Sequence, residues 1–380
     1  NSFGALDIVL KDYDLEDTVF EMNKKAAELV NEAITEYRSE HPEVKRNLYV
    51  AGALGPSNKS ISVTGGVTFE ELIHSYYTAV SGLLAGGVDL ILFETIQDTR
   101  NLKAAYLGLK KAMEENYTVP LMLSFTIEST GTTLAGQTAD AFYYAVNHMN
   151  PFSVGLNCAT GPEFMTQFLK TLNNISNTYI SVYPNAGLPN EDGKYEETPD
   201  TLSAKIEPFF QNNYLNIVGG CCGTTPEHIQ KIKEKSVNYS PRVIDENKDF
   251  NDVSGLIALE TPKDRPIYVG ERTNVIGSRI FKNLIASEKF DEATEVARLQ
   301  IKGRADVIDI CLANPDRDEI ADMKAFLDKV AKFAKVPLMI DSTDINVVKE
   351  GLTYLQGKGI INSINLEDGE KKFADMAKVI

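Results

Sequence analysis

From residue 48 onward the chain alternates short apolar runs with longer stretches of helical periodicity. Each run is rich in Val, Ile and Leu and lacks a regular polar face, which predicts strands buried on both sides. Such strands, separated by helices, predict parallel β-α-β units. The predicted strands are 48–54, 89–94, 120–126, 152–158, 179–183 and 215–220, and the predicted helices are 68–85, 99–115, 138–150, 162–173 and 199–211.

Six such units in series predict an α/β fold, a (β/α)₈ barrel of the TIM type that lacks its initial strands. The first residues are expected to form the end of the second barrel strand, followed by a long helix over 17–36. The chain has no initiating Met, so we expect a piece of a longer protein. The active site of such a barrel lies at the carboxyl ends of its strands.

A polar stretch over 236–252 carries Asn, Lys, Asp and Pro without apolar periodicity and predicts an interdomain linker. Beyond it the alternation restarts but stops after four units, so we expect two barrels in tandem, the second truncated. The predicted domains are a first barrel over 1–236, a linker over 237–262 and half of a second barrel over 263–380. In the second half, the predicted strands are 266–271, 307–311, 337–341 and 360–366, and the predicted helices are 291–302, 318–335 and 345–355.

Charge and composition exclude some classes of partner. The 380 residues carry a net charge of -16, with 54 acidic against 38 basic side chains. This balance opposes binding to nucleic acid or to an anionic membrane surface. No apolar run approaches the roughly 20 residues of a membrane span, and the first residues form no targeting segment. Few cysteines and no such segment predict a cytoplasmic protein.

Three of the four cysteines stand at two glycine-flanked strand ends, Cys158 in GLNCA and the pair Cys221 and Cys222 in GGCCGTTP. Neighbouring strand residues point to opposite faces, so both members of the pair reach one ion only where the backbone leaves strand geometry, which glycine permits. Three thiolates suit Zn²⁺ and leave one tetrahedral position open, as in catalytic zinc sites. The alternatives are packing as ordinary hydrophobes and, less favoured, a strained disulfide.

This ligand set favours activation of a thiol. Zinc with three thiolates holds a further thiolate and lowers the pKa of a substrate thiol while its sulfur stays electron-rich enough to attack a methyl group. Hydrolysis is the competing use of an open zinc, but it favours His and carboxylate ligands. The four histidines lie outside these motifs, and His228, which follows the cysteine pair, is interpreted as a surface residue of a helix.

The segments GLNC and GGCCGTTPEHI resemble the homocysteine-binding domain of zinc-dependent homocysteine S-methyltransferases, as do AGALGPSN and GGVDLILFETIQDTRNLKAA. The resemblance implies that Cys158, Cys221 and Cys222 bind Zn²⁺ and that the sulfur of homocysteine takes the fourth position. It also implies that Glu94 receives the amino group of the substrate. Asn185, in PNAGLP, either faces the metal or substrate or serves as a turn-forming residue.

The later segments PIYVGERTNVIGSRIFKNLI, ADVIDIC, PLMIDST and INSINLEDGEKKF resemble the pterin-binding domain of cobalamin-dependent methionine synthases. The resemblance implies a site for methyltetrahydrofolate. Asp341 has the type and place to pair with the amide and amino edge of a pterin, and Asn362 adds a donor and an acceptor. Glu271 and Asn274 stand at the end of the first strand. Each of them also fits a helix cap or a loop, but together at consecutive strand ends they favour a site.

The sequence departs from these families in two respects. Asp309 and Cys311 end their strand as Asp-Ile-Cys, where many pterin domains have Asp-Ile-Asn, so these two residues carry less weight. The Asp-Gly strand that shapes the amino acid pocket and the later pterin-contacting strands are both absent. We therefore expect that this piece does not complete methyl transfer from folate by itself.

The two domains in this order resemble the amino-terminal part of cobalamin-dependent methionine synthases. The implied reaction moves a methyl group from methylcobalamin to the homocysteine thiolate, with methyltetrahydrofolate as the primary donor. No corrinoid-binding segment is present, so the corrinoid is expected on a missing domain or a separate protein. The alternatives are a homocysteine S-methyltransferase with another methyl donor and a non-catalytic zinc-binding module that docks thiols.

Overall fold

The computed structural model describes residues 2–245, 248, 252–260 and 265–380. The chain divides into two compact units, Asn1–Ala139 with Val146–Asp249 and Asp140–Ala145 with Phe250–Ile380. The boundaries of the predicted linker stay a prediction. Within the described ranges, no helix is both long and apolar enough to cross a membrane.

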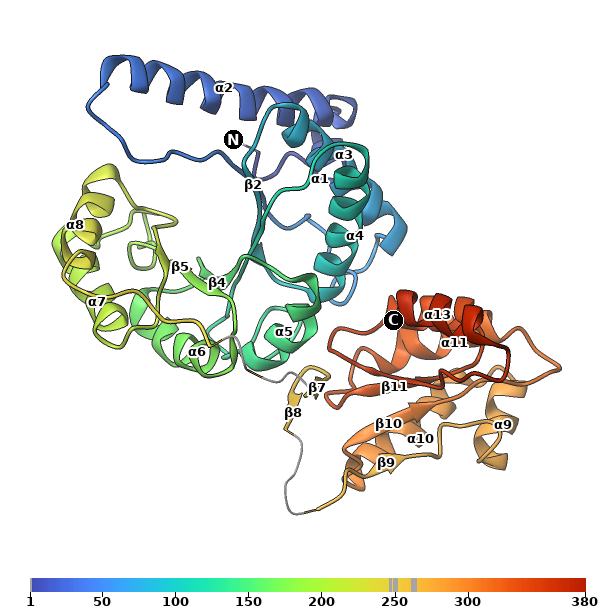
Figure 1. The fold of residues 1–380 in the computed structure, drawn as a ribbon. Coiled ribbons are helices and arrows are strands. Elements are labelled where there is room, and N and C mark those ends of the chain that lie inside the picture. Colours follow the sequence, from blue (N-terminus) through green and yellow to red (C-terminus); the bar gives the residue numbers. More distant parts are fainter. Residues whose placement is uncertain (1, 246–247, 249–251, 261–264) are drawn as a thin grey trace. The chain divides into compact units, whose positions relative to one another are not determined.

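The first unit is built on a curled sheet of six parallel strands in sequential order, with helices along the outside of the arc (Figure 1). The strands are β1 (Ala51–Leu54), β2 (Leu90–Ile96), β3 (Leu121–Phe125), β4 (Ser153–Asn157), β5 (Tyr179–Tyr183) and β6 (Ile217–Val218). The α-helices of this unit are α1 (Asp7–Leu10), α2 (Val19–Glu40), α3 (Phe69–Ala85), α4 (Thr99–Glu115), α6 (Pro162–Ile175), α7 (Pro199–Gln211) and α8 (Pro226–Ser236). Helix α5 (Ala139–Val146) follows β3 in the chain, but its residues Asp140–Ala145 belong to the second unit. Short 3₁₀ turns cover Lys11–Tyr13, Glu16–Thr18 and Asn147–Met149.

Local sequence explains where these elements begin. Every residue of β3 and β4 is buried, as expected for apolar runs covered on both faces. Helix α3 begins after Thr68, which forms a capping box with Glu71, and α4 begins after Asp98, whose carboxylate accepts from Arg100 N at 2.9 Å. The prediction of an α/β fold with parallel strands is confirmed, and the curled sheet is that of a partial barrel.

The predicted strand at the opening of the chain is wrong. Residues 2–6 form a turn, and α1 begins at Asp7. The segment still lies beside the carboxyl end of β1, because Phe3 O accepts a hydrogen bond from Gly55 N at 2.7 Å. A single bond of this kind is too little to extend the ladder, so β1 is the edge of the described sheet.

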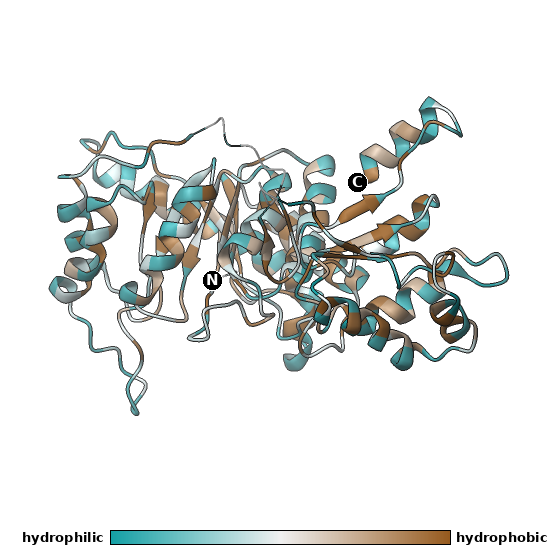
Figure 2. Cartoon of the chain, turned by 90° about the horizontal axis from the view of Figure 1, so that it is seen from below, coloured by the Kyte–Doolittle hydropathy of each residue, from teal (hydrophilic) through white to brown (hydrophobic). Residues whose placement is uncertain are grey.

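The second unit contains a sheet of four parallel strands in the order β12-β11-β10-β9. Hydrophobic residues gather on the strands of both units (Figure 2). The strands are β9 (Val269–Gly270), β10 (Val307–Ile310), β11 (Leu338–Asp341) and β12 (Ile360–Asn362). The helices are α9 (Arg279–Ala286), α10 (Phe290–Lys302), α11 (Glu319–Val330), α12 (Ile345–Leu352) and α13 (Glu370–Val379). In the core, the rings of Phe281 and Phe326 meet edge to face at 5.1 Å.

Three elements of the second unit, β7 (Val253–Ser254), β8 (Ala258–Leu259) and α9, were not predicted. Within the predicted linker, β7 and β8 form a short antiparallel hairpin. Helix α9 was missed as well, although Ser278 caps it through a bond from Phe281 N. The prediction of two barrels in tandem stays a prediction, since both described sheets are open.

Candidate metal centre and substrate sites

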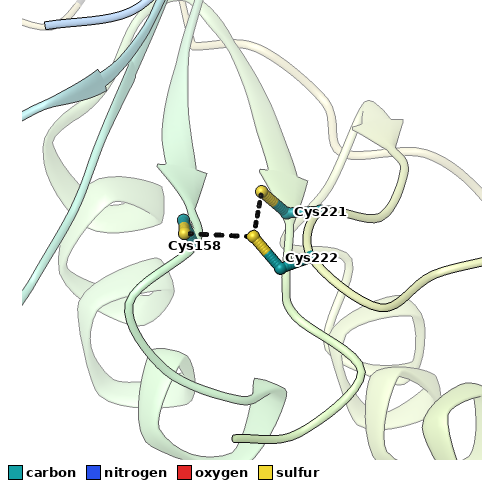
Figure 3. Close-up of side chains that lie close together, drawn as sticks. All are labelled: Cys158, Cys221 and Cys222. Carbon is teal, nitrogen blue, oxygen red and sulfur yellow. Dashed lines mark hydrogen bonds between the residues drawn. The ribbon is translucent and has the colours of Figure 1, made fainter. Parts of the chain in front are cut away.

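The structure brings the three predicted cysteines together at the carboxyl edge of the first sheet (Figure 3). Cys158 follows β4, whereas Cys221 and Cys222 follow β6. The Sγ atom of Cys222 lies 3.8 Å from that of Cys158 and 3.9 Å from that of Cys221. All three sulfurs lie within 4.8 Å of one another, and the described residues contain no other such group of His, Cys, Asp and Glu.

The backbone leaves strand geometry at both positions. Cys158 has a φ of 58°, in the left-handed region that non-glycine residues seldom adopt. Cys221 N donates to Pro184 O at 2.9 Å, and Ala186 N donates to Cys222 O at 2.9 Å. The loop after β6 is therefore tied to the loop after β5, and this turn points the two adjacent sulfurs toward Cys158 (Figure 3).

The thiols of the sulfur cluster differ in their pKa values. The neighbouring Cys221 thiol, with further support from Ala159 N, Cys222 and Asn185, lowers the pKa of Cys158 to about 5. The proximity of Cys158, together with burial, raises the pKa of Cys221 far above its ordinary value. One sulfur of the cluster is thus a thiolate at neutral pH, which makes it a ready ligand for a cation.

Asn185 lies buried against the cluster, with 4% of its surface exposed. Its Oδ1 accepts a hydrogen bond from Cys222 N at 3.1 Å, and its side chain also bonds the sulfur of Cys158. Of the two interpretations of Asn185, the structure favours contact with the site over a turn residue. Its contact with substrate stays a prediction.

Glu94 lies in β2 and is half-buried beside the cluster. Burial raises the pKa of Glu94, and the nearby Cys158 thiolate raises it further. The carboxyl group lines a pocket together with Tyr76, Phe93 and Asp98. A carboxyl group in such a pocket is placed to receive a cationic group of a small molecule.

The interpretation of His228 as a surface residue is wrong. Only 5% of its surface is exposed, and it stands in the first turn of α8. Its Nδ1 accepts a hydrogen bond from Thr225 N at 3.1 Å, which caps the helix, and its Nε2 lies 2.8 Å from Glu197 O. His228 therefore joins α8 to the loop that precedes α7.

Two further residues close to the cluster did not stand out in the sequence. Asn157 is fully buried, and its Nδ2 lies 4.0 Å from Cys221 Sγ. Tyr195 packs on Gly223, where an added Cβ would lie 2.3 Å from the ring, and it bonds Cys222. The sequence could have indicated Asn157, because it is a polar residue at the end of an apolar strand. It could not have indicated Tyr195, which lies in a polar loop.

In the second unit, Glu271, Asn274 and Asp341 lie together at the carboxyl edge of the sheet. The Nδ2 atom of Asn274 lies 3.3 Å from Glu271 Oε1, 3.2 Å from Asp309 Oδ2 and 3.4 Å from Asp341 Oδ2. Its Oδ1 accepts from Ile276 N at 2.8 Å, which fixes the orientation of the amide. One amide with two N–H groups thus serves three carboxyl groups.

Asp309, which carried less weight as a candidate, belongs to this cluster. It is 1% exposed, and its Oδ1 has no hydrogen-bond partner among the described residues. Burial raises the pKa of Asp309 to about 6, and burial followed by the charge of Glu271 raises that of Asp341. Cys311 is buried beside Asn274, to which it forms a backbone bridge. Asn362 pairs with Asp341 across the strands, but its side chain is exposed.

Residues 1–236 match the family described as homocysteine S-methyltransferase, and residues 270–380 match the family described as pterin binding enzyme. The first match spans more than half of the chain. The chain therefore belongs to the homocysteine S-methyltransferase family, and its second segment is similar to pterin binding enzymes.

Solved structures of similar fold include the homocysteine methyltransferase MmuM from Escherichia coli. Its metallated form is 24% identical, with a TM-score of 0.51, over 62% of this chain and 77% of that one. Its oxidized form is 23% identical over the same shares, also with a TM-score of 0.51. At this identity the likeness shows the fold of the first unit.

Proposed function

We propose that this chain activates homocysteine as a thiolate at a zinc ion held by Cys158, Cys221 and Cys222, so that the sulfur accepts a methyl group and methionine forms. Membership of the homocysteine S-methyltransferase family supports the substrate. The convergence of three sulfurs at the carboxyl edge of the sheet is the observation that carries the proposal.

The spacing of the sulfurs fits zinc. A tetrahedral ion with zinc–sulfur bonds of roughly 2.3 Å holds its sulfur ligands about 3.8 Å apart. Two of the separations between the sulfurs are 3.8 and 3.9 Å. When bound by three thiolates, zinc supplies an open position and the positive charge that ionises a thiol at neutral pH.

The protein's own groups orient the substrate in this proposal. Glu94 accepts hydrogen bonds from the substrate ammonium, and its partial burial strengthens that ion pair. Asn185 holds the loops of Cys158 and Cys222 in register through its side-chain amide. The substrate is therefore fixed at its sulfur and at its amino group, which leaves the sulfur lone pair free to attack.

The methyl transfer itself is a displacement at carbon. The bond between sulfur and the methyl carbon forms as the bond from that carbon to the donor breaks, and the electron pair of the broken bond leaves with the donor. We propose methylcobalamin, carried by another domain or a separate protein, as the immediate donor. This assigns the chain to cobalamin-dependent methionine synthesis.

The second unit supports methyltetrahydrofolate as the primary donor. It matches pterin binding enzymes, and the carboxyl groups around Asn274 are acceptors for the amide and amino edge of a pterin. Glu271 follows β9, whereas Asp341 and Asn362 are the last residues of β11 and β12. We propose that these four residues hold the pterin ring.

Turnover of homocysteine with supplied methylcobalamin tests the proposal. The zinc-loaded chain is expected to form methionine, measured by mass spectrometry. Cys222→Ser is expected to lose zinc and to lower the rate by at least about a hundredfold. Cys311→Ser, which changes the cysteine of the second unit, is the matched control and keeps its zinc.

The same assay separates the alternatives. Zinc binding without methionine from any donor would indicate a module that only docks thiols. Methionine from S-methylmethionine or betaine, but not from methylcobalamin, would indicate a homocysteine methyltransferase with another donor. A chain that binds no zinc with all three cysteines reduced would contradict the proposal itself.

A further inference from the structure

The side chain of Asn157 connects the two ends of the proposed substrate site. Its Oδ1 accepts hydrogen bonds from Thr95 N at 3.0 Å and from Ser124 Oγ at 2.6 Å. Its Nδ2 donates to Thr95 Oγ1 at 2.8 Å and reaches Cys221 Sγ at 4.0 Å. Every donor and acceptor of this fully buried amide is therefore in use. One side chain contacts both the strand that carries Glu94 and a sulfur of the cluster.

The bonds from Asn157 hold an unusual piece of backbone. Thr95 has a φ of 58°, a left-handed conformation that is rare for a β-branched residue. The pairing of β2 with β3 shifts at this point, so that Glu94 and Thr95 stand opposite the single residue Ser124. Such a bulge bends the strand and re-aims a side chain, here that of Glu94.

We propose that Asn157 is a positioning residue that sets the distance between the Glu94 carboxyl group and the sulfur cluster, and thereby selects homocysteine among thiols. The inference rests on the proposed function, in which the substrate sulfur lies at the metal and its amino group at Glu94. Without the amide, Thr95 is free to return to extended backbone, and Glu94 turns away from the substrate. The cluster loses only its long contact to Cys221, so metal binding persists.

A comparison of two thiols tests this role. Homocysteine and 4-mercaptobutanoate differ only in the amino group, and calorimetry measures the binding of each to the zinc-loaded full chain. The native protein is expected to prefer homocysteine by at least about tenfold, because an unpaired Glu94 penalises the analogue. In Asn157→Ser the preference is expected to fall below about threefold, with 4-mercaptobutanoate bound within about twofold of the native affinity and one zinc retained per chain.

A double-mutant cycle shows whether Asn157 acts through Glu94. In a Glu94→Gln background, Asn157→Ser is expected to change the preference by less than about twofold, because the group that it positions is already gone. Asn216→Ala is the matched control. That amide also bridges two segments, from Ile180 N to Arg242 O, but at the amino end of the sheet. It is expected to leave the preference unchanged.

The outcomes separate this inference from the function on which it rests. A native chain that binds neither thiol refutes the proposed function. An Asn157→Ser chain that keeps its preference, or that loses both thiols together with its zinc, overturns the positioning role alone. Ser124→Ala removes one of the bonds to the amide and is the milder variant if Asn157→Ser fails to fold. It is expected to reduce the preference in the same direction, and an unchanged preference in that variant also overturns the role.

Discussion

Asp309 shows how a single buried carboxyl group can lower the stability of the fold at neutral pH. It is 1% exposed, one of its oxygens has no partner among the described residues, and Asp341 and Glu271 lie nearby. Burial therefore raises its pKa to about 6, above the value of 3.8 expected in the unfolded chain. Between these two values the folded state holds a proton that the unfolded state lacks. The free energy of unfolding consequently falls as the pH rises through this window.

Asp309→Asn removes the free-energy cost of ionising this buried carboxyl group. The variant is expected to raise the free energy of unfolding at pH 7.5 by on the order of 1 kcal/mol and by less at pH 5.5, where the native group is largely protonated. Thermal denaturation of the variant and of the native chain at both pH values measures the difference in the free energy of unfolding. Asp306→Asn is the control with the opposite sign, because Arg265 lowers the pKa of Asp306 and the ion pair stabilises the fold at pH 7.5. A gain for Asp309→Asn that is equal at both pH values would contradict the argument.

At the residue scale, the sequence predicted the cysteines that converge in the cluster better than the side chains that hold them in place. The three cysteines stood out because a cysteine next to glycine at the end of a strand has few structural roles. Asn157 and His228 did not, because an Asn or His in a strand or helix has many ordinary uses. Their roles depend on partners distant in the sequence, such as Thr95 and Glu197, and those pairings exist only in the folded chain.

Helix α2 is held against α3 by close backbone approach. A Cβ added at Gly82 would lie 2.4 Å from Phe20 O, and one added at Gly86 would lie 2.4 Å from Lys24 O. Gly82 lies in the last turn of α3 and Gly86 is its C-cap residue, one turn later, so the two glycines form a flat stripe on which α2 rests. A methyl group at either position forces the two helices apart.

Gly82→Ala is expected to lower the free energy of unfolding by about 1–3 kcal/mol, although Ala is the better helix former by about 1 kcal/mol. The steric clash outweighs the gain in propensity, because backbone atoms of α2 cannot move without repacking the whole helix. Urea denaturation measures the loss. Gly4→Ala serves as the control, since an added Cβ there meets nothing within 4 Å. Equal stability of the two variants would show that α2 yields to the methyl group.

At the element scale, the strands and helices with strong periodicity were predictable and the irregular ones were not. The bounds of α4 and α7 agree with the sequence pattern, because Asp98 and Thr198 cap them and a polar residue follows each. The hairpin of β7 and β8 was missed because two-residue strands carry no periodicity. The opening strand was wrong for a different reason, since a strand needs a partner ladder that Phe3 alone does not supply.

At the scale of the whole molecule, a metal at the sulfur cluster would stabilise one unit and not the other. Its ligands follow β4 and β6, two strands of the first sheet, so binding links segments far apart in the chain. A ligand that binds only the folded state, present at a hundred times its Kd, stabilises that state by about 2.7 kcal/mol. The four-stranded sheet of the second unit contributes no residue to this cluster.

Hydrogen exchange can resolve the two units separately. Zinc added to the chelator-treated chain is expected to slow amide exchange after β4 and β6, around Cys158 and around Cys222, because opening these loops then requires release of the metal. Peptides that cover β10 are expected to exchange at the same rate with and without zinc. Cys222→Ser is expected to abolish the protection, whereas Cys311→Ser keeps it. Protection that reaches β10 equally would mean that the metal stabilises both units together, and protection that is absent after β6 would mean that the cysteine pair does not hold the ion.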